Sequence, residues 1–311
     1  MKHILKNMLL LTAGIGICIN LDAHFKTTPG MPIHVTEDGR IIIFPYENGD
    51  KVPDFSFCGY RQSESPIPTV KAKVYIRPSG NDDTRLIQQA IDYVASLPVG
   101  KDGFRGAVQL MPGTFHVKGQ LLIRHGGIVL RGSGYKENGT TILGEGFMKD
   151  EVVRVLGTDD ARTGDTLLAD KTYIPVGSTF IPMADKGKLK AGDRIRVVRP
   201  STAAWLEELG TDRLGNQQEY NFSKWKPGQY DMTWERTVKA VTGTGIEIDI
   251  PLTLSLDPQY GGGYILPLEW KGRIENVGIE NLRFESAFDA NNPKDENHRW
   301  QAAVSYTHLR A

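Results

Sequence analysis

Short apolar runs separated by glycine dominate the first half of the chain and constrain its fold more than any other feature. Between positions 106 and 156 they read GAVQLM, TFHV, QLLI, IVLR, TTIL and VVRVL. Apolar residues fill consecutive positions in these runs, as in strands buried on both faces of a parallel arrangement. Two-residue hairpin turns are scarce between them, so they cannot pair as hairpins throughout. The pattern favours short parallel strands in stacked coils.

The spacing of the runs predicts the size of a coil. Leu110 and Leu130 are 20 residues apart, and Leu130 and Val153 are 23 residues apart. Such a repeat suits a coil of three short strands and three turns that stacks on its neighbours. Stacked coils need a cap that covers the exposed core and strand edges at each end.

One helix is predicted over residues 82–97, and it is well placed to be such a cap. Asp82 and Asp83 can cap its start, and Leu97-Pro98 ends it. Its apolar residues fall on one face, which must cover something, and they are Leu86, Ile87, Ala90, Ile91 and Val94.

The order of these segments resembles the amino-terminal region of the pectate lyase superfamily. The carrying segments are GNDDTRLIQQAIDYV, RGAVQLMPGTFHV and QLLIRHGGIVLRGSGYKENGTTIL. In that family a capping helix with an Asp-Asp start and an Ile-Gln-x-Ala-Ile core precedes a strand ending in Pro-Gly. The resemblance covers residues 53–157 and returns at 272–286. It implies an all-β fold, a right-handed parallel β-helix with an amino-terminal capping helix, in a superfamily of lyases, hydrolases, epimerases and fibres.

Six segments are expected along the chain. Residues 1–23 read as a signal peptide, with Lys2, His3 and Lys6 before an apolar run shorter than a membrane span. This predicts a secreted or periplasmic protein with no membrane span after cleavage. The other segments are a surface arm (24–72), the capping helix and first coils (73–164), an inserted β-domain (165–268), a resumed β-helix (269–303) and a non-native tail that continues no coil (304–311).

Charge and cysteine content narrow the class of partner. Removal of residues 1–23 leaves 35 basic and 36 acidic residues. The chain therefore lacks the basic excess of a nucleic-acid-binding protein. Cys58 is then the one remaining cysteine, so an intramolecular disulfide is excluded. Its side chain is expected to be buried as a small hydrophobic group.

The densest polar cluster is the segment AFDANNPKDENHRW at 287–300, predicted to be a loop after a coil strand. As a functional site it would use Glu296 or Asp289 for a cation, with Ca²⁺ as one candidate, or for sugar hydroxyls. His298 would transfer a proton, Arg299 would bind a carboxylate, and Trp300 would stack on a sugar face. The alternative is a solvated loop with no function.

A second candidate surface is aromatic. Trp205, Trp225 and Trp234 lie within one stretch of 30 residues inside the predicted insertion, together with Tyr220, Phe222 and Tyr230. Flat aromatic faces can bind pyranose rings, whereas the alternative is that these side chains fill the core of a small β-domain.

The resemblance and the signal peptide together predict a secreted carbohydrate-active protein of pectate lyase type. It would cleave acidic polysaccharide by β-elimination or by hydrolysis. The alternative is a non-catalytic glycan-binding or adhesive β-helix, with a polysaccharide as partner in either case.

Overall fold

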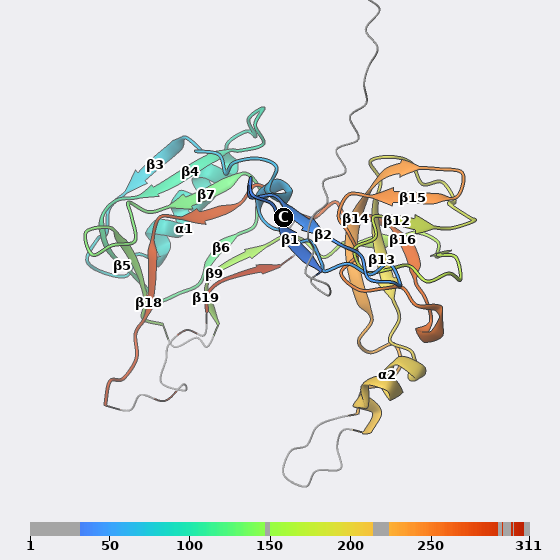
Figure 1. Cartoon of the computed structure of the whole chain (residues 1–311). Helices are drawn as coiled ribbons and strands as arrows, with labels where there is room; N and C mark the ends of the chain where they lie inside the picture. The colour runs from blue at the N-terminus through green and yellow to red at the C-terminus, as the bar shows by residue number, and fades with distance from the viewer. Residues whose placement is uncertain are drawn as a thin grey trace, which may run out of the picture.

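The chain folds mostly into β-strands, arranged in two lobes in the computed structural model (Figure 1). The structure describes residues 32–146, 150–213, 224–291, 294, 300 and 302–307. The predicted signal peptide lies outside these residues. Among the described residues, no helix combines the length and the apolar character needed to cross a membrane.

One lobe holds helix α1 and three parallel sheets. The sheets have the orders β17-β7-β4-β3, β18-β8-β5 and β19-β9-β6. Each pass of the chain gives one strand to each sheet in turn: β4, β5 and β6, then β7, β8 and β9, then β17, β18 and β19. The six predicted runs form β4 (Gly106–Leu110), β5 (Gly113–Val117), β6 (Leu121–Ile123), β7 (Ile128–Arg131), β8 (Thr140–Gly144) and β9 (Glu151–Leu156).

The third pass comes from the carboxyl-terminal part of the chain. Its strands are β17 (Gly278–Glu280), β18 (Arg283–Ser286) and β19 (Ala302–Thr307), which pair in parallel with β7, β8 and β9. Asn276 and Asn281 precede two of them with φ of 57° and 54°, a left-handed conformation that asparagine tolerates in turns. β19 extends past residue 303, so the prediction that no coil includes residues beyond 303 is wrong.

The register of the coils differs from the predicted spacing. Val108 pairs with Leu130 in one sheet, 22 residues later, whereas Phe115 pairs with Ile142 in the next. Val153 pairs with Leu121 in the third sheet and does not stack on Leu130. The turns between strands differ in length, so the number of residues per coil differs from sheet to sheet. The predicted spacing, which compared residues of different sheets, is therefore wrong.

Helix α1 (Thr84–Ser96) covers the amino-terminal end of these coils, as predicted. Ile87, Ala90, Ile91 and Val94 are buried in one hydrophobic cluster with the inward residues of all three sheets. β3 (Ala72–Ile76) pairs with β4 beside it. The cap thus removes from water the apolar end that stacked coils would expose.

Side chains at the start of the capping helix also accept hydrogen bonds from backbone N–H groups at the edge of β5. The Asp83 carboxylate accepts the backbone N–H groups of Ser79 (2.9 Å) and His116 (3.3 Å), and Asp83 is fully buried. The backbone N–H of Thr84 bonds to the Asp82 carboxylate at 3.0 Å. Asp82 therefore caps the helix as predicted, but the prediction for the Asp83 side chain is wrong, because that carboxylate bonds the neighbouring backbone.

The other lobe is an antiparallel sheet of seven strands between β9 and β17. Its core contains Ile195, Val197, Ile246 and Ile265. The strands are β10 (Arg162–Thr163), β11 (Leu167–Leu168), β12 (Phe180–Pro182), β13 (Arg194–Arg199), β14 (Met232–Val241), β15 (Gly245–Ile248) and β16 (Tyr264–Glu269). The helix α2 (Ala203–Leu209) and two 3-10 turns, η2 (Thr211–Arg213) and η3 (Pro258–Tyr260), complete it.

The amino-terminal arm packs on the antiparallel lobe. It contains the hairpin of β1 (Ile33–Val35) and β2 (Ile41–Ile43) and a 3-10 turn, η1 (Tyr60–Ser63). The Asp50 carboxylate accepts the Tyr173 hydroxyl at 2.8 Å and the backbone N–H of Val176 at 2.8 Å. Cys58 in this arm is exposed, so the prediction that it is a buried hydrophobe is wrong.

Candidate functional site

The outward face of the sheet β18-β8-β5 gathers acidic and basic side chains from all three passes of the chain. Phe115 and Val117 are fully buried on β5, so His116 between them points outward. His116 shares its register row with Leu143 on β8, which in turn pairs with Glu285 on β18. We call the set His116, Glu145, Arg283 and Glu285 the histidine face.

A carboxylate holds the imidazole of the histidine face in one orientation. His116 Nδ1 lies 2.9 Å from Glu145 Oε1, and their side chains are 33% and 29% exposed. Because an ionised carboxylate only accepts hydrogen bonds, Nδ1 carries the proton of a neutral imidazole in this pair. The other ring nitrogen, Nε2, then has a free lone pair and can accept a proton.

The same face carries a guanidinium. Arg283 Nε donates to Thr141 Oγ1 at 3.2 Å and lies 3.0 Å from Glu285 Oε1. Neither contact uses the two terminal nitrogens, and the side chain is 41% exposed. Within the described part of the chain these nitrogens make no hydrogen bond or ion pair, and a guanidinium can use such a pair to bind a carboxylate in the bidentate manner.

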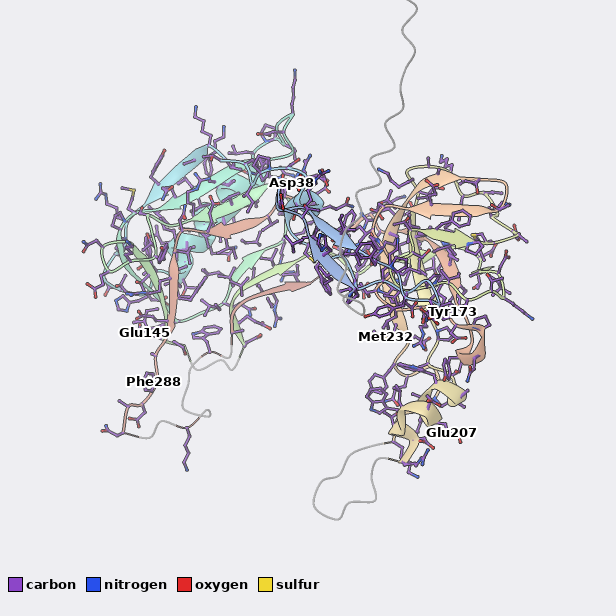
Figure 2. All side chains as sticks on the ribbon, in the orientation of Figure 1. Asp38, Glu145, Tyr173, Glu207, Met232 and Phe288 are labelled. Carbon is purple, nitrogen blue, oxygen red and sulfur yellow. The ribbon has the colours of Figure 1, made fainter. Side chains whose placement is uncertain are left out.

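The loop predicted as a candidate site leaves and returns beside the histidine face. The backbone N–H of Ala287 bonds to Gly144 at 2.8 Å, immediately before Glu145, and that of Trp300 bonds to Ser286 Oγ at 3.1 Å. Figure 2 shows Glu145 at the edge of the parallel lobe, with Phe288 beyond it on the segment after β18.

The predicted residues of this loop have different outcomes. Glu296, His298 and Arg299 lie outside the described residues. Asp289 is exposed, and its carboxylate accepts the backbone N–H of Asn291 at 2.9 Å, as in an ordinary polar turn.

Trp300 belongs to the core of the parallel lobe. It is 4% exposed and packs in the main hydrophobic cluster, against the backbone of Gly144 and Gly146. A Cβ atom at Gly144 would lie 2.2 Å from the Trp300 ring, so only glycine fits there. The prediction that Trp300 stacks on a sugar is therefore wrong, because a buried ring has no free face.

The three tryptophans of the second predicted surface lie in the antiparallel lobe but in different surroundings. Trp234 packs against the lobe's core, and its Nε1 donates to Thr253 Oγ1 at 2.8 Å. Trp205 on α2 lies 4.6 Å from the guanidinium of Arg199, and Trp225 lies 4.3 Å from the ring of Tyr230. Trp234 thus fits the alternative that these side chains fill the core of the β-domain. Trp205 and Trp225 lie instead around α2, near the loop end of the lobe.

Two arginines of β13, Arg194 and Arg196, lie near one carboxylate of the neighbouring strand. Glu235 on β14 lies 3.4 Å from Arg194 and 3.6 Å from Arg196, and it also binds Arg273. Burial raises the pKa of Glu235, but the hydrogen bond from Arg273 and the three positive charges outweigh this effect and lower it below its usual value. One carboxylate thus faces three guanidinium groups, so this cluster keeps a net positive charge.

The described residues give no clear calcium site. Among them, no three acidic, histidine or cysteine side chains lie together in a group that could hold a metal ion. The candidate cation ligand Glu296 lies outside the described part of the chain, so the structure assigns Ca²⁺ to none of the residues above.

The histidine face was missed from the sequence because its members are far apart along the chain. Arg283, one of these members, is 142 residues away from its hydrogen-bond partner Thr141. The one local signal was the alternation Phe115, His116, Val117, in which a polar side chain stands between two inward apolar ones.

Comparisons with known proteins give fold neighbours of low similarity. No family model matches the chain, and no curated protein matches its sequence. Similar solved structures include the Gp54 tailspike of Acinetobacter baumannii bacteriophage AP22, in complex with A. baumannii capsular saccharide (12% identity, TM-score 0.33, 65% of this chain and 29% of that one). A second is the tailspike gp49 of Pseudomonas phage LKA1 (16% identity, TM-score 0.32, 63% of this chain and 27% of that one). A third is the tailspike gp61 of Pseudomonas phage phi297 (13% identity, TM-score 0.34, 73% of this chain and 31% of that one). The chain spans about three tenths of each tailspike's length.

Proposed function

We propose that the chain is a secreted carbohydrate-active protein of pectate lyase type that cleaves acidic polysaccharide by β-elimination at the histidine face. The observation that carries this proposal is the pairing of His116 with Glu145 on the same outward face as Arg283, which lies two strands away from His116. A lyase acting on uronate polymers must neutralise the sugar carboxylate and remove the proton at C5 with a base.

The fold supports this proposal. Three strands per pass, each stacked in parallel on the previous pass, are the arrangement of a parallel β-helix. We infer that its coils are right-handed, because connections between parallel strands of one sheet almost always are. The outward face of the sheet β18-β8-β5 runs across three stacked strands, and the proposal places the polymer chain across them.

One residue is assigned to each of the two tasks of the elimination, neutralisation of the carboxylate and removal of the C5 proton. Arg283 would bind the uronate carboxylate and stabilise the charge that develops when the C5 proton leaves. His116 Nε2 would accept that proton, and Glu145 would stabilise the imidazolium that forms. The electron pair of the broken C5–H bond then forms the double bond between C4 and C5. The bond from C4 to the glycosidic oxygen breaks, and that oxygen keeps the electron pair and takes up a proton from water.

A non-catalytic glycan-binding β-helix is the second candidate. The specific observation in its favour is the pair Trp225 and Tyr230 beside α2, close to Trp205 and its guanidinium partner Arg199. Arg199 is 7% exposed, and within the described residues its Nε has no hydrogen-bond partner. A buried cation beneath an indole strengthens the aromatic platform that a sugar ring would contact.

The test is to incubate the full chain with a panel of uronate polymers and to measure unsaturated ends by ultraviolet absorbance. We expect product from at least one polymer and a loss of about 100-fold or more in H116A, the usual scale for removal of a general base. The control is H34A, in β1 on the arm, which should keep full activity.

Three results would count against elimination at this face. H116A with unchanged activity would place the base elsewhere. New reducing ends without unsaturation would indicate hydrolysis, for which Glu145 and Glu285 are the carboxylates on this face. Binding without any cleavage would favour the second candidate.

A further inference from the structure

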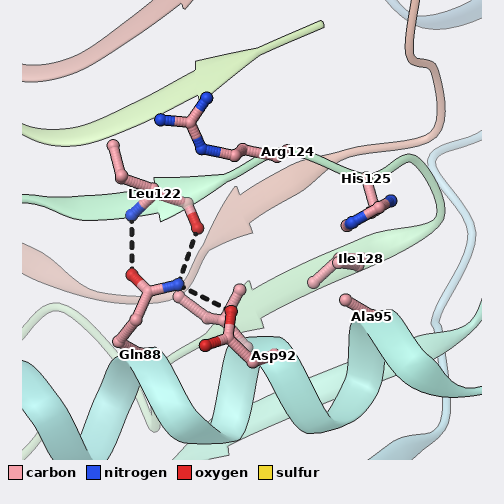
Figure 3. A pocket seen from close by; sticks show the side chains of 8 residues that line it. Gln88, Asp92, Ala95, Leu122, Arg124, His125 and Ile128 are labelled. Carbon is pink, nitrogen blue, oxygen red and sulfur yellow. Dashed lines mark hydrogen bonds between the residues drawn. The ribbon is translucent and has the colours of Figure 1, made fainter.

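A separate hollow lies on another side of the parallel lobe, between helix α1 and the turn from β6 to β7 (Figure 3). Its volume is about 240 Å³, less than the ~300–1,000 Å³ of pockets for drug-sized ligands. We call it the cap pocket; its walls include Gln88, Asp92, Ala95, Leu122, Arg124 and His125. The space suits a ligand of about one sugar ring.

Opposite charges line this pocket without neutralising each other. Arg124 and His125 follow β6, and Asp92 lies on α1; all three side chains are exposed. Among the residues that the structure describes, no ion pair joins Arg124 or His125 to Asp92 or to another carboxylate. One side of the pocket therefore offers donors to an anion, and the other offers acceptors to hydroxyl groups.

The rest of the lining sets the shape of the ligand. Gln88 is engaged with the backbone of Leu122 and with Asp92, so its amide is not free for a ligand. The accessible apolar part of the lining is Ala95, with the buried side chains of Ile91 and Ile128 behind it. An apolar floor between an anion-binding and a hydroxyl-binding wall matches a pyranose ring, which has one face of C–H bonds and a polar rim.

We propose that the cap pocket binds a single carboxylate-bearing sugar ring, a monosaccharide acid. Its carboxylate lies on Arg124 and His125, a hydroxyl group donates to the Asp92 oxygen that Gln88 does not use, and its C–H face lies on Ala95. The choice of a sugar acid rests on the proposed function, since the uronate polymers of that proposal are built of such rings. The pocket is distinct from the histidine face, which belongs to the sheet of β5.

The test is titration calorimetry of the full chain with galacturonate and glucuronate, each compared with its neutral sugar, and with acetate and inorganic phosphate. We expect the sugar acids to bind and the neutral sugars to bind at least about 10-fold more weakly, since a hydrogen bond to a charged group contributes ~1.5–3 kcal/mol. R124A should weaken binding of the acids by about 10-fold or more. R85A, an exposed arginine of α1 outside the pocket, is the matched control and should bind like the unchanged chain.

Two further measurements separate this inference from the proposed function. H116A should slow cleavage by about 100-fold or more and keep the affinity for the sugar acid. R124A should lose that affinity with an unchanged circular dichroism spectrum. The inference is wrong if R124A binds as R85A does, or if neutral sugars bind as tightly as the acids. Equal affinity for acetate or phosphate would also overturn it, because the pocket would then recognise only an anion.

Discussion

Gln88 on α1 substitutes for a missing strand at the open edge of β6. Its side-chain carbonyl accepts the backbone N–H of Leu122 at 2.8 Å, and its amide donates to the Leu122 carbonyl at 3.0 Å (Figure 3). In the sheet β19-β9-β6, the other edge of β6 pairs with β9. The replacement of Gln88 by alanine therefore leaves both backbone groups of Leu122 without a protein partner.

The expected cost of Q88A is about 2 kcal/mol. Each of the two hydrogen bonds contributes ~0.5–1.5 kcal/mol, and the third, from the Gln88 amide to Asp92 at 2.9 Å, is exposed and adds little. Alanine has the better helix propensity by a few tenths of a kcal/mol, which offsets part of the loss. Q89A is the matched control, because Gln89 is exposed on the same helix and experiences only the propensity term.

Hydrogen exchange read by mass spectrometry gives a local measurement. A loss of about 2 kcal/mol in the local opening free energy corresponds to about 30-fold faster exchange of the Leu122 amide in Q88A. Exchange in Q89A should stay near that of the unchanged chain. If Q88A and Q89A exchange alike at this strand, the side chain does not cap the edge, and the physical account of α1 as a polar as well as an apolar cap is refuted.

Two further predictions concern stability. In E235Q the melting temperature should fall at neutral pH and change less on acidification than in the unchanged chain. The pKa of Glu235 is lower in the folded chain than in the unfolded chain, so its charge stabilises the fold above the unfolded pKa, and this contribution is lost as the pH falls through the folded pKa. Thermal unfolding between neutral pH and about pH 3 checks this, and a parallel pH profile for both proteins would contradict it. In W300A the free energy of unfolding should fall by about 3 kcal/mol, and in W300F it should fall clearly less, because the ring is buried in the core. Urea unfolding followed by circular dichroism measures this. Equal stability of W300A and the unchanged chain would contradict the burial of that ring.

The local elements of the parallel lobe could be predicted from the sequence. The runs that form β4 to β9 are apolar at consecutive positions, and the face of α1 repeats its apolar residues with the helical period. Both signals arise within a few residues, so no knowledge of distant contacts is needed. Their pairing could not be predicted in the same way, since the turns between strands vary in length and the stacking register depends on contacts between passes.

Side-chain roles were harder to predict than strands. Asp83 and Trp300 have the residue types of a helix cap and of a sugar platform, yet both are buried and bond or pack within the lobe. Residue type alone does not separate these roles, because burial depends on which segments pack around the position. Cys58 shows the converse, as a residue in an apolar stretch that the fold leaves exposed.

The histidine face also shows why an insertion can interrupt the parallel sheets without disturbing their chemistry. The antiparallel lobe lies between β9 and β17, so the chain leaves after the third strand of one pass and returns at the first strand of the next. β17 and β18 pair with β7 and β8 in unbroken register, which brings Arg283 to Thr141. Because the side chains on this face are fixed by strand pairing rather than by the connecting segment, the length of the insertion has no effect on their spacing. A polymer lying along this sheet would therefore meet residues from both sides of the insertion as one continuous surface.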